Sequence, residues 1–512
     1  GTVTGNVDLG SGANAFNNLA GGLFNIATAD VGVGNALTNS GTLAPGGIGT
    51  IATATLNGNL VQTASGHFAV DINPTAPAAD QLTVTGTASL AGVITPKLTS
   101  LFTAPQTFTI LTAAGGVTNN GLSVDNSGVV NYVLTFPTAN DVQLAVNGIN
   151  FGAASGLTPN EQAVAQTLQQ AFVAGGGNLG DLLLFLANLN AAGYAGSLDR
   201  LMPTPYLAEA QTALLSSFDF GNSLFSCPTP AGDGHGLFGE GNCYWLLPAA
   251  HTASYAGNNG FAGFNEKAGG LTGGVQGALA PNWYLDVGLG YERSSIGGDF
   301  FSANGDIFRG GAALKYIRDR WLVAGSVSGS VARYDTSRYG IPIGGTATAN
   351  ADTTTLDLRL RFAYAFGNET FYVKPLVDFD AVGLWRGAIN ENGAGALNLQ
   401  VQSQNDWLAS AAPAVEFGNQ WQTGHDIWRP YVRAGMRFLS EKNLNATADF
   451  TGAPAGVSPF TITAPLDQVL AEVSAGFDFW RGERYSLRVA YDGRFGAHTS
   501  SNGGEVKLRA SF

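Results

Sequence analysis

Residues 243–512 alternate polar and apolar side chains in one short segment after another, and the chain ends on an aromatic residue, Phe512. One segment has Trp283, Leu285, Val287, Leu289 and Tyr291 on one face, and Tyr284, Asp286, Gly288, Gly290 and Glu292 on the other. Successive side chains of a β-strand point to opposite faces. Polarity that alternates with a period of two therefore places one face in lipid or a protein core and the other in water. The pattern predicts a large antiparallel β-structure.

The same alternation recurs in at least five further segments. Their paired faces are Leu356, Leu358, Leu360 and Phe362 against Asp357, Arg359 and Arg361; Val373, Val377 and Phe379 against Lys374, Asp378 and Asp380; Val473, Ala475, Phe477 and Phe479 against Glu472, Ser474 and Asp478; Leu487, Val489 and Tyr491 against Arg488, Asp492 and Arg494; and Val506, Leu508, Ala510 and Phe512 against Glu505, Lys507 and Arg509. A soluble β-sandwich would show the same pattern, with its polar face in bulk water.

Two observations favour a barrel in an outer membrane over a soluble sandwich. Many segments run ten residues or longer, close to the roughly 9–11 residues that a tilted strand needs to cross a bilayer. Aromatic residues gather near the expected strand ends, at Trp283, Trp321, Tyr334, Trp385, Phe438 and Trp480, as they do at membrane interfaces.

We predict about twelve barrel strands, an even number as in single-chain outer-membrane barrels. Their expected ranges are 243–255, 264–280, 282–296, 304–318, 320–335, 350–367, 370–389, 398–418, 427–447, 460–480, 484–496 and 502–512. Tight links such as 280–282 and 318–320 alternate with longer polar ones such as 336–349 and 448–459. Short turns on one rim and longer loops on the other are typical of a periplasmic and an extracellular side.

Composition narrows the class of protein further. The 71 glycines and the charged fraction of 12% form an unusual pairing for a soluble enzyme, and the net charge of -13 argues against a nucleic-acid partner. No stretch of 18 apolar residues occurs, so we expect any crossing of a membrane to be made by strands. Gly1 opens in mid-pattern without an initiating Met, and we expect the chain to be a processed or truncated piece of a longer exported precursor.

The chain has two cysteines, Cys227 and Cys243, which frame 15 residues rich in Gly and Pro. In an oxidising compartment this pair would close a disulfide that stabilises the fold by about 3 kcal/mol. The alternative is a pair of thiols that are free or bind a metal. His235 lies between the two cysteines and could be a further metal ligand. The spacing lacks a paired CxxC half-site, so we expect no metal here.

Residues 1–155 contain no Glu and no Arg, one Lys (Lys97) and six Asp. Short β-branched runs, such as those in 67–73, 81–94 and 106–117, are separated by Asn, Gly, Ser and Pro turns. Few charges and strands at loose intervals favour a parallel β-solenoid (β-helix), whose rungs stack over a continuous core. A separate β-sandwich remains the alternative.

Residues 156–226 change to a helical pattern. Thr158 and Glu161 form a capping box with Pro159 at the first helical position. A second helix is expected from about residue 178, a short third one over 198–201, and a fourth over about 204–226. The fourth is slim on one side, with Ala208, Ala213, Ser216, Ser217 and Gly221, so it can thread and plug a barrel lumen; the alternative is a helix packed outside, on the solenoid.

No catalytic motif stands out in these residues. The five histidines show no HExxH spacing, no GxSxG occurs, and the glycine-rich run 269–279 lacks the Lys-Ser/Thr of a phosphate loop. We therefore expect no enzymatic activity, no cofactor and no metal site. The lumenal charges form a mixed set that suits salt bridges and helix contacts: Asp378, Asp380, Arg386, Arg433, Arg437, Glu472, Arg488, Asp492 and Arg494.

Solenoid, helical linker and terminal barrel, in this order, resemble the translocation unit of a classical (type Va) autotransporter. The likeness is carried by GTLAPGG (41–47) and LTVTGTASLAG (82–92) as passenger rungs, LDRLMPTPYLAEAQTALL (198–215) as the helical segment before the barrel, and KLRASF (507–512) as the terminal strand. The expected domains are a passenger end and autochaperone (1–155), a linker (156–226) with its pore-threading helix, and a barrel (243–512).

The resemblance implies outer-membrane insertion by the barrel-assembly machinery, with periplasmic chaperones as further partners. That machinery would read the last strand with Val506, Leu508, Ala510 and Phe512 on one face. It also implies a passenger, often an adhesin, that crosses as a hairpin and is displayed at the cell surface by a monomeric barrel. The alternative function is an outer-membrane pore plugged by its helical segment.

One family feature is missing. Self-cleaving members cut between paired asparagines in the lumenal helix, and this helix offers only Asp219 and Asn222. We therefore expect a passenger that is uncleaved or cut elsewhere.

Overall fold

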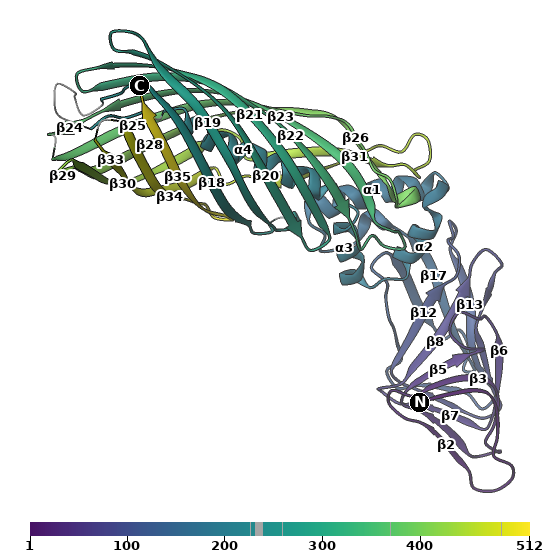
Figure 1. Cartoon of the computed structure of the whole chain (residues 1–512). Coiled ribbons are helices and arrows are strands. Elements are labelled where there is room, and N and C mark those ends of the chain that lie inside the picture. The colour runs from purple at the N-terminus through teal and green to yellow at the C-terminus, as the bar shows by residue number, and fades with distance from the viewer. Residues whose placement is uncertain (226, 231–238, 259, 369, 483) are drawn as a thin grey trace. The chain divides into compact units, whose positions relative to one another are not determined.

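The computed structural model describes residues 1–225, 227–230, 239–258, 260–368, 370–482 and 484–512. The described chain divides into two units (Figure 1). The first comprises Gly1–Leu157, Ala165–Leu198 and Ala453–Val457, and the second comprises Thr158–Val164, Asp199–Gly452 and Ser458–Phe512.

The first unit is a β-solenoid followed by helices. Its strands are β1 (Thr2–Asp8), β2 (Ala15–Asn18), β3 (Leu23–Asp30), β4 (Ala36–Asn39), β5 (Thr42–Pro45), β6 (Thr53–Asn57), β7 (Asn59–Gln62), β8 (His67–Asn73), β9 (Ala78–Ala79), β10 (Gln81–Val84), β11 (Ala88–Leu90), β12 (Val93–Leu98), β13 (Gln106–Ala113), β14 (Val117–Asn119), β15 (Ser123–Val124), β16 (Val130–Thr135) and β17 (Asp141–Ile149). Most pair in parallel, as β6, β10 and β13 do, and as β4, β7 and β11 do. Parallel stacking is the arrangement of a solenoid, not of a β-sandwich.

Apolar side chains of the solenoid stack in register from rung to rung. Leu43 pairs with Phe68 and Phe68 with Ile94, and all three are buried. A polar ladder runs beside this core, because Asn18 Nδ2 donates to Asn39 Oδ1 at 2.8 Å and Asn39 Nδ2 donates to Gln62 Oε1 at 3.4 Å. The ladder satisfies amides that would otherwise be buried without partners.

Five short helical elements follow the solenoid: η1 (Phe151–Ala153), α1 (Pro159–Val173), η2 (Gly177–Leu179), α2 (Gly180–Ala187) and α3 (Ala191–Asp199). The capping box at α1 is present, since the Thr158 N–H donates to Glu161 Oε2 at 2.6 Å. The prediction for the third helix was wrong at its start. Asn190 Oδ1 accepts the Gly193 N–H at 2.8 Å, and this asparagine cap begins α3 seven residues before the predicted position.

Among the described residues, no single helix is long and apolar enough to cross a membrane. The bent pair Pro159–Val173 and Gly177–Ala187, at 109°, meets that test by length and composition only.

The second unit is a closed antiparallel barrel of twelve strands (Figure 1). The strands are β18 (Cys243–Tyr255), β19 (Phe264–Ala280), β20 (Trp283–Gly298), β21 (Phe301–Arg318), β22 (Trp321–Arg338), β23 (Ala347–Tyr364), β25 (Phe371–Arg386), β28 (Gln404–Asn419), β30 (Asp426–Leu439), β33 (Val469–Arg481), β34 (Tyr485–Phe495) and β35 (Thr499–Ser511). Each pairs with the next in this order, and β35 pairs with β18 to close the barrel.

The two rims of the barrel differ. One, here called the turn rim, has short links such as 281–282 and 319–320, where Asn282 and Asp319 take positive φ values of 70° and 55°. Asn and Asp tolerate this conformation better than bulkier residues. The other, here called the loop rim, carries the longer connections, including 256–263, 339–346 and 387–403.

The sequence-based ranges 398–418, 427–447 and 460–480 each merged a barrel strand with a strand of another sheet. A four-stranded rim sheet consists of β26 (Ile389–Asn390), β27 (Leu399–Val401), β31 (Asn443–Phe450) and β32 (Phe460–Pro465), with η3 (Gly395–Leu397) beside it. The alternation continues across the breaks at 402–403 and 440–442, so the period alone cannot separate the two sheets. Two short strands, β24 (Phe366–Gly367) and β29 (Trp421–Thr423), extend the barrel at the turn rim.

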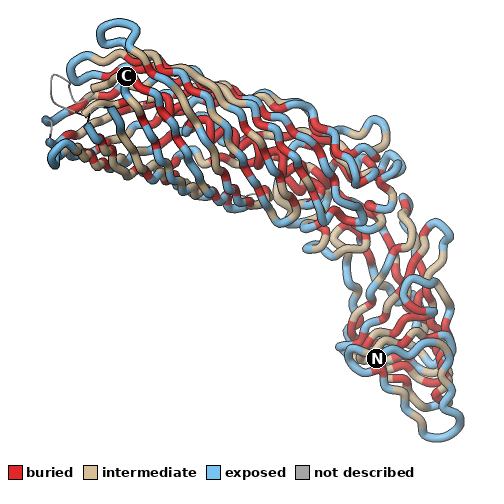
Figure 2. The backbone as a smooth tube through the Cα atoms, in the orientation of Figure 1, coloured by how far each residue is buried: buried red, intermediate tan, exposed pale blue. Residues whose placement is uncertain are grey.

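Burial alternates along the barrel strands (Figure 2). The outward face is an apolar belt that includes Leu271, Val287, Leu289, Phe308, Val327, Leu358, Leu360, Phe379, Val432, Val473 and Leu508. Among the predicted interface aromatics, Trp283, Trp321 and Phe438 are exposed, but Tyr334 and Trp480 are buried in the barrel. Their prediction was wrong because they lie one residue out of phase with the outward face of β22 and β33.

Candidate functional site: the helix-filled barrel lumen

Helix α4 (Thr204–Ser223) occupies the barrel lumen (Figure 1). Its 20 residues give a length of about 30 Å, and all of them are buried except Asp219 and the partly buried Asn222. Alanine, serine and glycine keep it narrow: a Cβ on Gly221 would lie 3.1 Å from Arg359 Cζ. The small side chains are what allow a helix to fit inside twelve strands.

Cations from strands on several sides of the wall bind the C-terminal half of α4. Arg309 of β21 donates to the Ser216 carbonyl at 3.0 Å, and Arg359 of β23 donates to the Phe218 carbonyl at 3.0 Å. Arg494 of β34 donates to Asp219 at 2.8 Å, and Lys507 of β35 donates to the Ser223 carbonyl at 2.9 Å. Positive charge around this end complements the negative end of the helix dipole.

The N-terminal half of α4 is held at the loop rim. Tyr206 donates to Glu391 Oε1 at 2.9 Å, and Thr336 donates to Glu209 Oε1 at 2.5 Å. Arg338, at the loop end of β22, forms a bidentate pair with Glu391 and also donates to the Arg200 carbonyl at 2.8 Å. The chain therefore enters the lumen at the loop rim and reaches the turn rim at Ser223.

A buried charge network connects the wall with the middle of the helix. Asp380 accepts from Arg359 at 2.5 Å and from Arg437, and Arg437 Nε donates to Glu472 at 2.8 Å. Glu472 also accepts from Arg494 at 3.2 Å. Buried ion pairs persist only when each charge has partners, and the network gives Asp380 and Glu472 two cations each.

The structure brings four of the nine predicted lumenal charges into this network. Asp380, Arg437, Glu472 and Arg494 contact one another as described, and Asp378 pairs with Arg361 at 2.6 Å. The other four lie apart from the helix contacts: Arg488 pairs with Asp478 at 2.8 Å, Arg433 lies 3.9 Å from Asp492, and Arg386 pairs with Asp406 at 2.7 Å.

Several helix contacts were missed from the sequence. Arg359 and Arg361 stand on the polar face of their strand in the alternation, and both donate to Asn222 Oδ1, at 2.9 and 2.6 Å. Arg309, Arg338 and Lys507 were also missed. The two-residue alternation of the strands places such residues in the lumen. Only the position of helix α4 shows which of them contact the helix.

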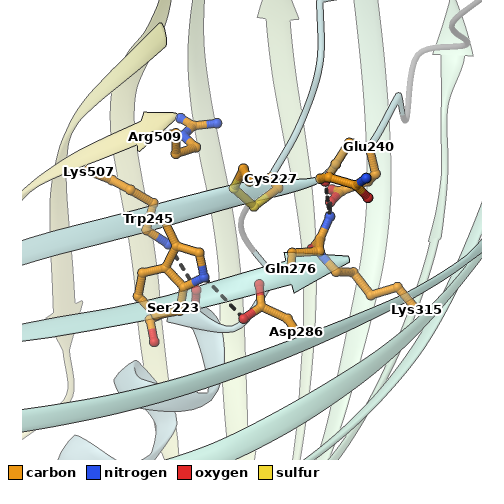
Figure 3. The surroundings of a disulfide bond; sticks show 12 residues. Ser223, Cys227, Glu240, Trp245, Gln276, Asp286, Lys315, Lys507 and Arg509 are labelled. Atoms are coloured by element: carbon orange, nitrogen blue, oxygen red, sulfur yellow. Dashed lines mark hydrogen bonds and ion pairs between the residues drawn. A yellow bond between two sulfur atoms is a disulfide. The ribbon is translucent and has the colours of Figure 1, made fainter. Parts of the chain in front are cut away.

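A disulfide joins Cys227 and Cys243 near the turn-rim end of the lumen, with Cα atoms 6.2 Å apart (Figure 3). Trp245 Nε1 donates to Asp286 at 3.1 Å, and Lys507 Nζ lies 4.5 Å from the centre of the Trp245 ring. Lys315 pairs with Glu240 at 2.8 Å. His235 lies outside the described residues.

The described lumen leaves little open space. A cavity of ≈ 180 Å³ lies beside the end of α4, lined by Asp219, Arg433, Arg488, Asp492 and Glu505 among others. Among the described residues, no group of three or more His, Cys, Asp or Glu side chains could hold a metal ion. The geometry is that of a barrel whose lumen holds a chain segment.

The family described as "Autotransporter beta-domain" matches residues 244–492. No curated protein matches the chain.

Solved structures similar to this chain include translocator domains. The translocator domain of the autotransporter NalP from Neisseria meningitidis is 16% identical, with a TM-score of 0.47, over 61% of this chain and 100% of that one. The β-domain of the Bordetella autotransporter BrkA is 16% identical, with a TM-score of 0.42, over 53% and 100%. The transport unit of AIDA-I from Escherichia coli is 11% identical, with a TM-score of 0.41, over 59% and 99%.

The family match spans eleven of the twelve barrel strands, from β18 to β34. The belt of apolar residues around a closed barrel is the surface that an outer membrane requires. The chain is an outer-membrane translocator whose residues 244–492 match the autotransporter β-domain family.

Proposed function

We propose that this chain is the passenger end and translocator of a type Va autotransporter, which displays residues 1–155 at the bacterial surface. The observation that carries this proposal is the path of α4, from Tyr206 at the loop rim to Ser223 at the turn rim. Short turns face the periplasm in barrels of this kind and longer loops face outward. A chain that enters the lumen from the loop rim has its preceding residues on the outer side.

Residues 1–155 would act as the autochaperone of the passenger. Successive rungs of the solenoid stack mostly in parallel, as β8 and β12 do over six register pairs. Stacking buries apolar surface such as Phe68 on Ile94, so folding outside the cell would release free energy without ATP.

The last strand would serve as the signal for the barrel-assembly machinery, after delivery by periplasmic chaperones. Val506, Leu508 and Phe512 are exposed on the outer face of β35 or at its end, and Ala510 is partly exposed. Tyr244 packs against Phe512, with ring centres 4.6 Å apart. These side chains present an apolar stripe that a partner can read before the barrel closes.

The passenger would be an adhesin. These 512 residues would have no enzymatic activity and bind no cofactor. The barrel would act as a monomer, with outer-membrane lipid and its own passenger as partners and no nucleic acid. The net charge of -13 supports the last point.

An outer-membrane channel fits the lumen less well. Helix α4 is hydrogen-bonded to β21, β22, β23, β34 and β35, and the cavity beside it measures only ≈ 180 Å³. Single-channel recording tests the point. We expect small or no current from the intact protein and large steady current after deletion of residues 204–226; large current from intact protein would support a channel.

Surface display is tested on intact cells. A cysteine placed at the exposed Val33 should react with a membrane-impermeant maleimide, whereas one placed at the turn-rim residue Asp319 should react only after the outer membrane is broken. The reverse labelling pattern would overturn the proposed orientation.

A further inference from the structure

The closing seam of the barrel is interrupted. Strands β18 and β35 pair from Cys243 to Leu246 and again from Ala249 to Tyr255, but Leu247 and Pro248 have no register partner in β35. Pairing of β18 with β19 is unbroken and includes Pro248 with Leu271. Proline has no N–H to donate, so the missing hydrogen bond lies on the side of β35.

An apolar groove lies on the outer face beside this interruption. Its volume is ≈ 580 Å³, and its lining comes from four strands, β33, β34, β35 and β18. The apolar and aromatic lining residues include Tyr244, Leu246, Phe479, Tyr485, Leu487, Leu508 and Ala510. Leu246 and Leu508 are register partners across the seam, so one occupant of the groove would touch both closing strands.

The groove has a cation at its turn-rim end. Arg481, the last residue of β33, lines it and is exposed. The guanidinium carbon of Arg484 lies 5.8 Å from the ring centre of Tyr485, another lining residue. Neither arginine forms an ion pair with any residue that the structure describes. An apolar groove that ends at a cation with no ion pair to the part of the chain that the structure describes is complementary to a molecule with an apolar chain and an anionic head.

We propose that this groove binds one acyl chain of an anionic phospholipid, with its phosphate at Arg481, and that the bound lipid stabilises the β18–β35 seam. The chain would cover the outer edge of the seam beside Pro248, where the hydrogen-bond ladder is interrupted. That the lipid comes from the periplasmic leaflet rests on the orientation proposed above. Binding itself does not depend on that orientation, because a symmetric bilayer offers the lipid on both sides.

A second groove of similar size provides an internal control. It measures ≈ 610 Å³ and lies on the outer face between β20 and β25, lined by Leu285, Leu314, Val327, Leu358, Leu360 and Phe379. Its ionisable lining residues, Arg359 and Asp380, are buried and paired with each other at 2.5 Å. This groove would accept any acyl chain without preference for the head group.

The test uses the full chain in nanodiscs of phosphatidylethanolamine alone or with one fifth phosphatidylglycerol. Folded barrels run faster than unfolded ones on unheated gels, so the temperature of half-unfolding can be read from the gel. We expect phosphatidylglycerol to raise this temperature in the wild type and the rise to be lost in Arg481→Gln. The control Arg318→Gln, at another exposed site on the turn rim, should keep it. Equal rises in wild type and Arg481→Gln would overturn the proposal.

A second measurement does not depend on unfolding. Native mass spectrometry of the protein released from the mixed nanodiscs should show one retained phosphatidylglycerol for the wild type. The groove-filling variants Ala510→Phe and Leu487→Trp should lose it, and Val327→Trp, in the second groove, should retain it. Retention of phosphatidylglycerol by both filled variants, or of phosphatidylethanolamine in equal amount by the wild type, would contradict specific binding at the seam.

Discussion

The guanidinium carbon of Arg437, on strand β30, lies 4.0 Å from the centre of the Phe218 ring on the lumenal helix. The same arginine is 1% exposed and pairs with both Asp380 and Glu472. One residue of the wall therefore contacts the helix through its flat face and fixes two carboxylates through its edge. This double role makes Arg437 the place where helix docking and wall stability are most directly coupled.

Replacement of Arg437 by methionine should strongly destabilise the barrel. Asp380 and Glu472 would each lose a cation in a buried setting, and breaking a buried pair from one side costs about 3–5 kcal/mol. The half-unfolding temperature on unheated gels should fall well below that of the wild type. The matched variant Arg433→Met should have a small effect, because Arg433 lies 3.9 Å from Asp492, which is 47% exposed. Equal losses in the two variants would contradict the assigned role.

A bulky residue at position 221 should displace the lumenal helix. A Cβ there would already lie 3.1 Å from Arg359 Cζ and 3.3 Å from Asp357 Oδ2, so alanine requires a small shift and leucine cannot be accommodated. We expect Gly221→Leu to raise single-channel conductance while the strands stay folded, and Gly221→Ala to remain close to the wild type. If Gly221→Leu were as closed as the wild type, the helix would not be what seals the lumen.

The faces of the barrel strands could be predicted from the sequence, because alternation follows directly from backbone geometry. Leu358 and Leu360 are exposed, and Arg359 between them is buried, as period two requires. The rim sheet could not be predicted in this way, since its strands alternate as the barrel strands do. Nor could the pairing of Arg338 with Glu391, because Arg338 ends β22, Glu391 lies in the loop-rim connection 387–403, and 53 residues separate them in the sequence.

Reduction of the disulfide between Cys227 and Cys243 should lower the stability of the barrel. The bridge closes a loop with a sequence separation of 16, and loops of this length contribute about 3 kcal/mol. We expect Cys227→Ser to lower the half-unfolding temperature and to make it independent of added dithiothreitol. The wild type should respond to dithiothreitol by the same amount. No response in the wild type would show that the bridge adds nothing to the folded barrel.

The solenoid should lose stability as the pH rises from about 4 to about 7. Burial raises the pKa of Asp80 to about 7, against the opposing effect of two N–H donors, from Asp71 and Ala52. In the unfolded chain the pKa of an aspartate is about 4. The folded state therefore holds the proton more tightly, and its contribution to stability is complete below pH ~4 and disappears as the pH passes through 7.

Urea unfolding of residues 1–157, followed by circular dichroism from pH 4 to 8, measures this dependence. The urea midpoint should fall across the interval in the wild type. In Asp80→Asn the fall should disappear, whatever the absolute stability of the variant, because no proton is exchanged at that position. A midpoint in the wild type that rises with pH would show that the N–H donors outweigh burial.

The passenger should remain joined to the barrel. The lumenal helix has no pair of adjacent asparagines, and its one asparagine, Asn222, has Oδ1 held by Arg359 at 2.9 Å and by Arg361 at 2.6 Å. We expect a single band of about the full 52.7 kDa on a denaturing gel after heating, both in the wild type and in Asn222→Ala. A barrel-sized fragment that begins near residue 220 in the wild type, and is absent from Asn222→Ala, would show that the helix is cut at this residue. A fragment present in both would place the cut elsewhere, by an external protease.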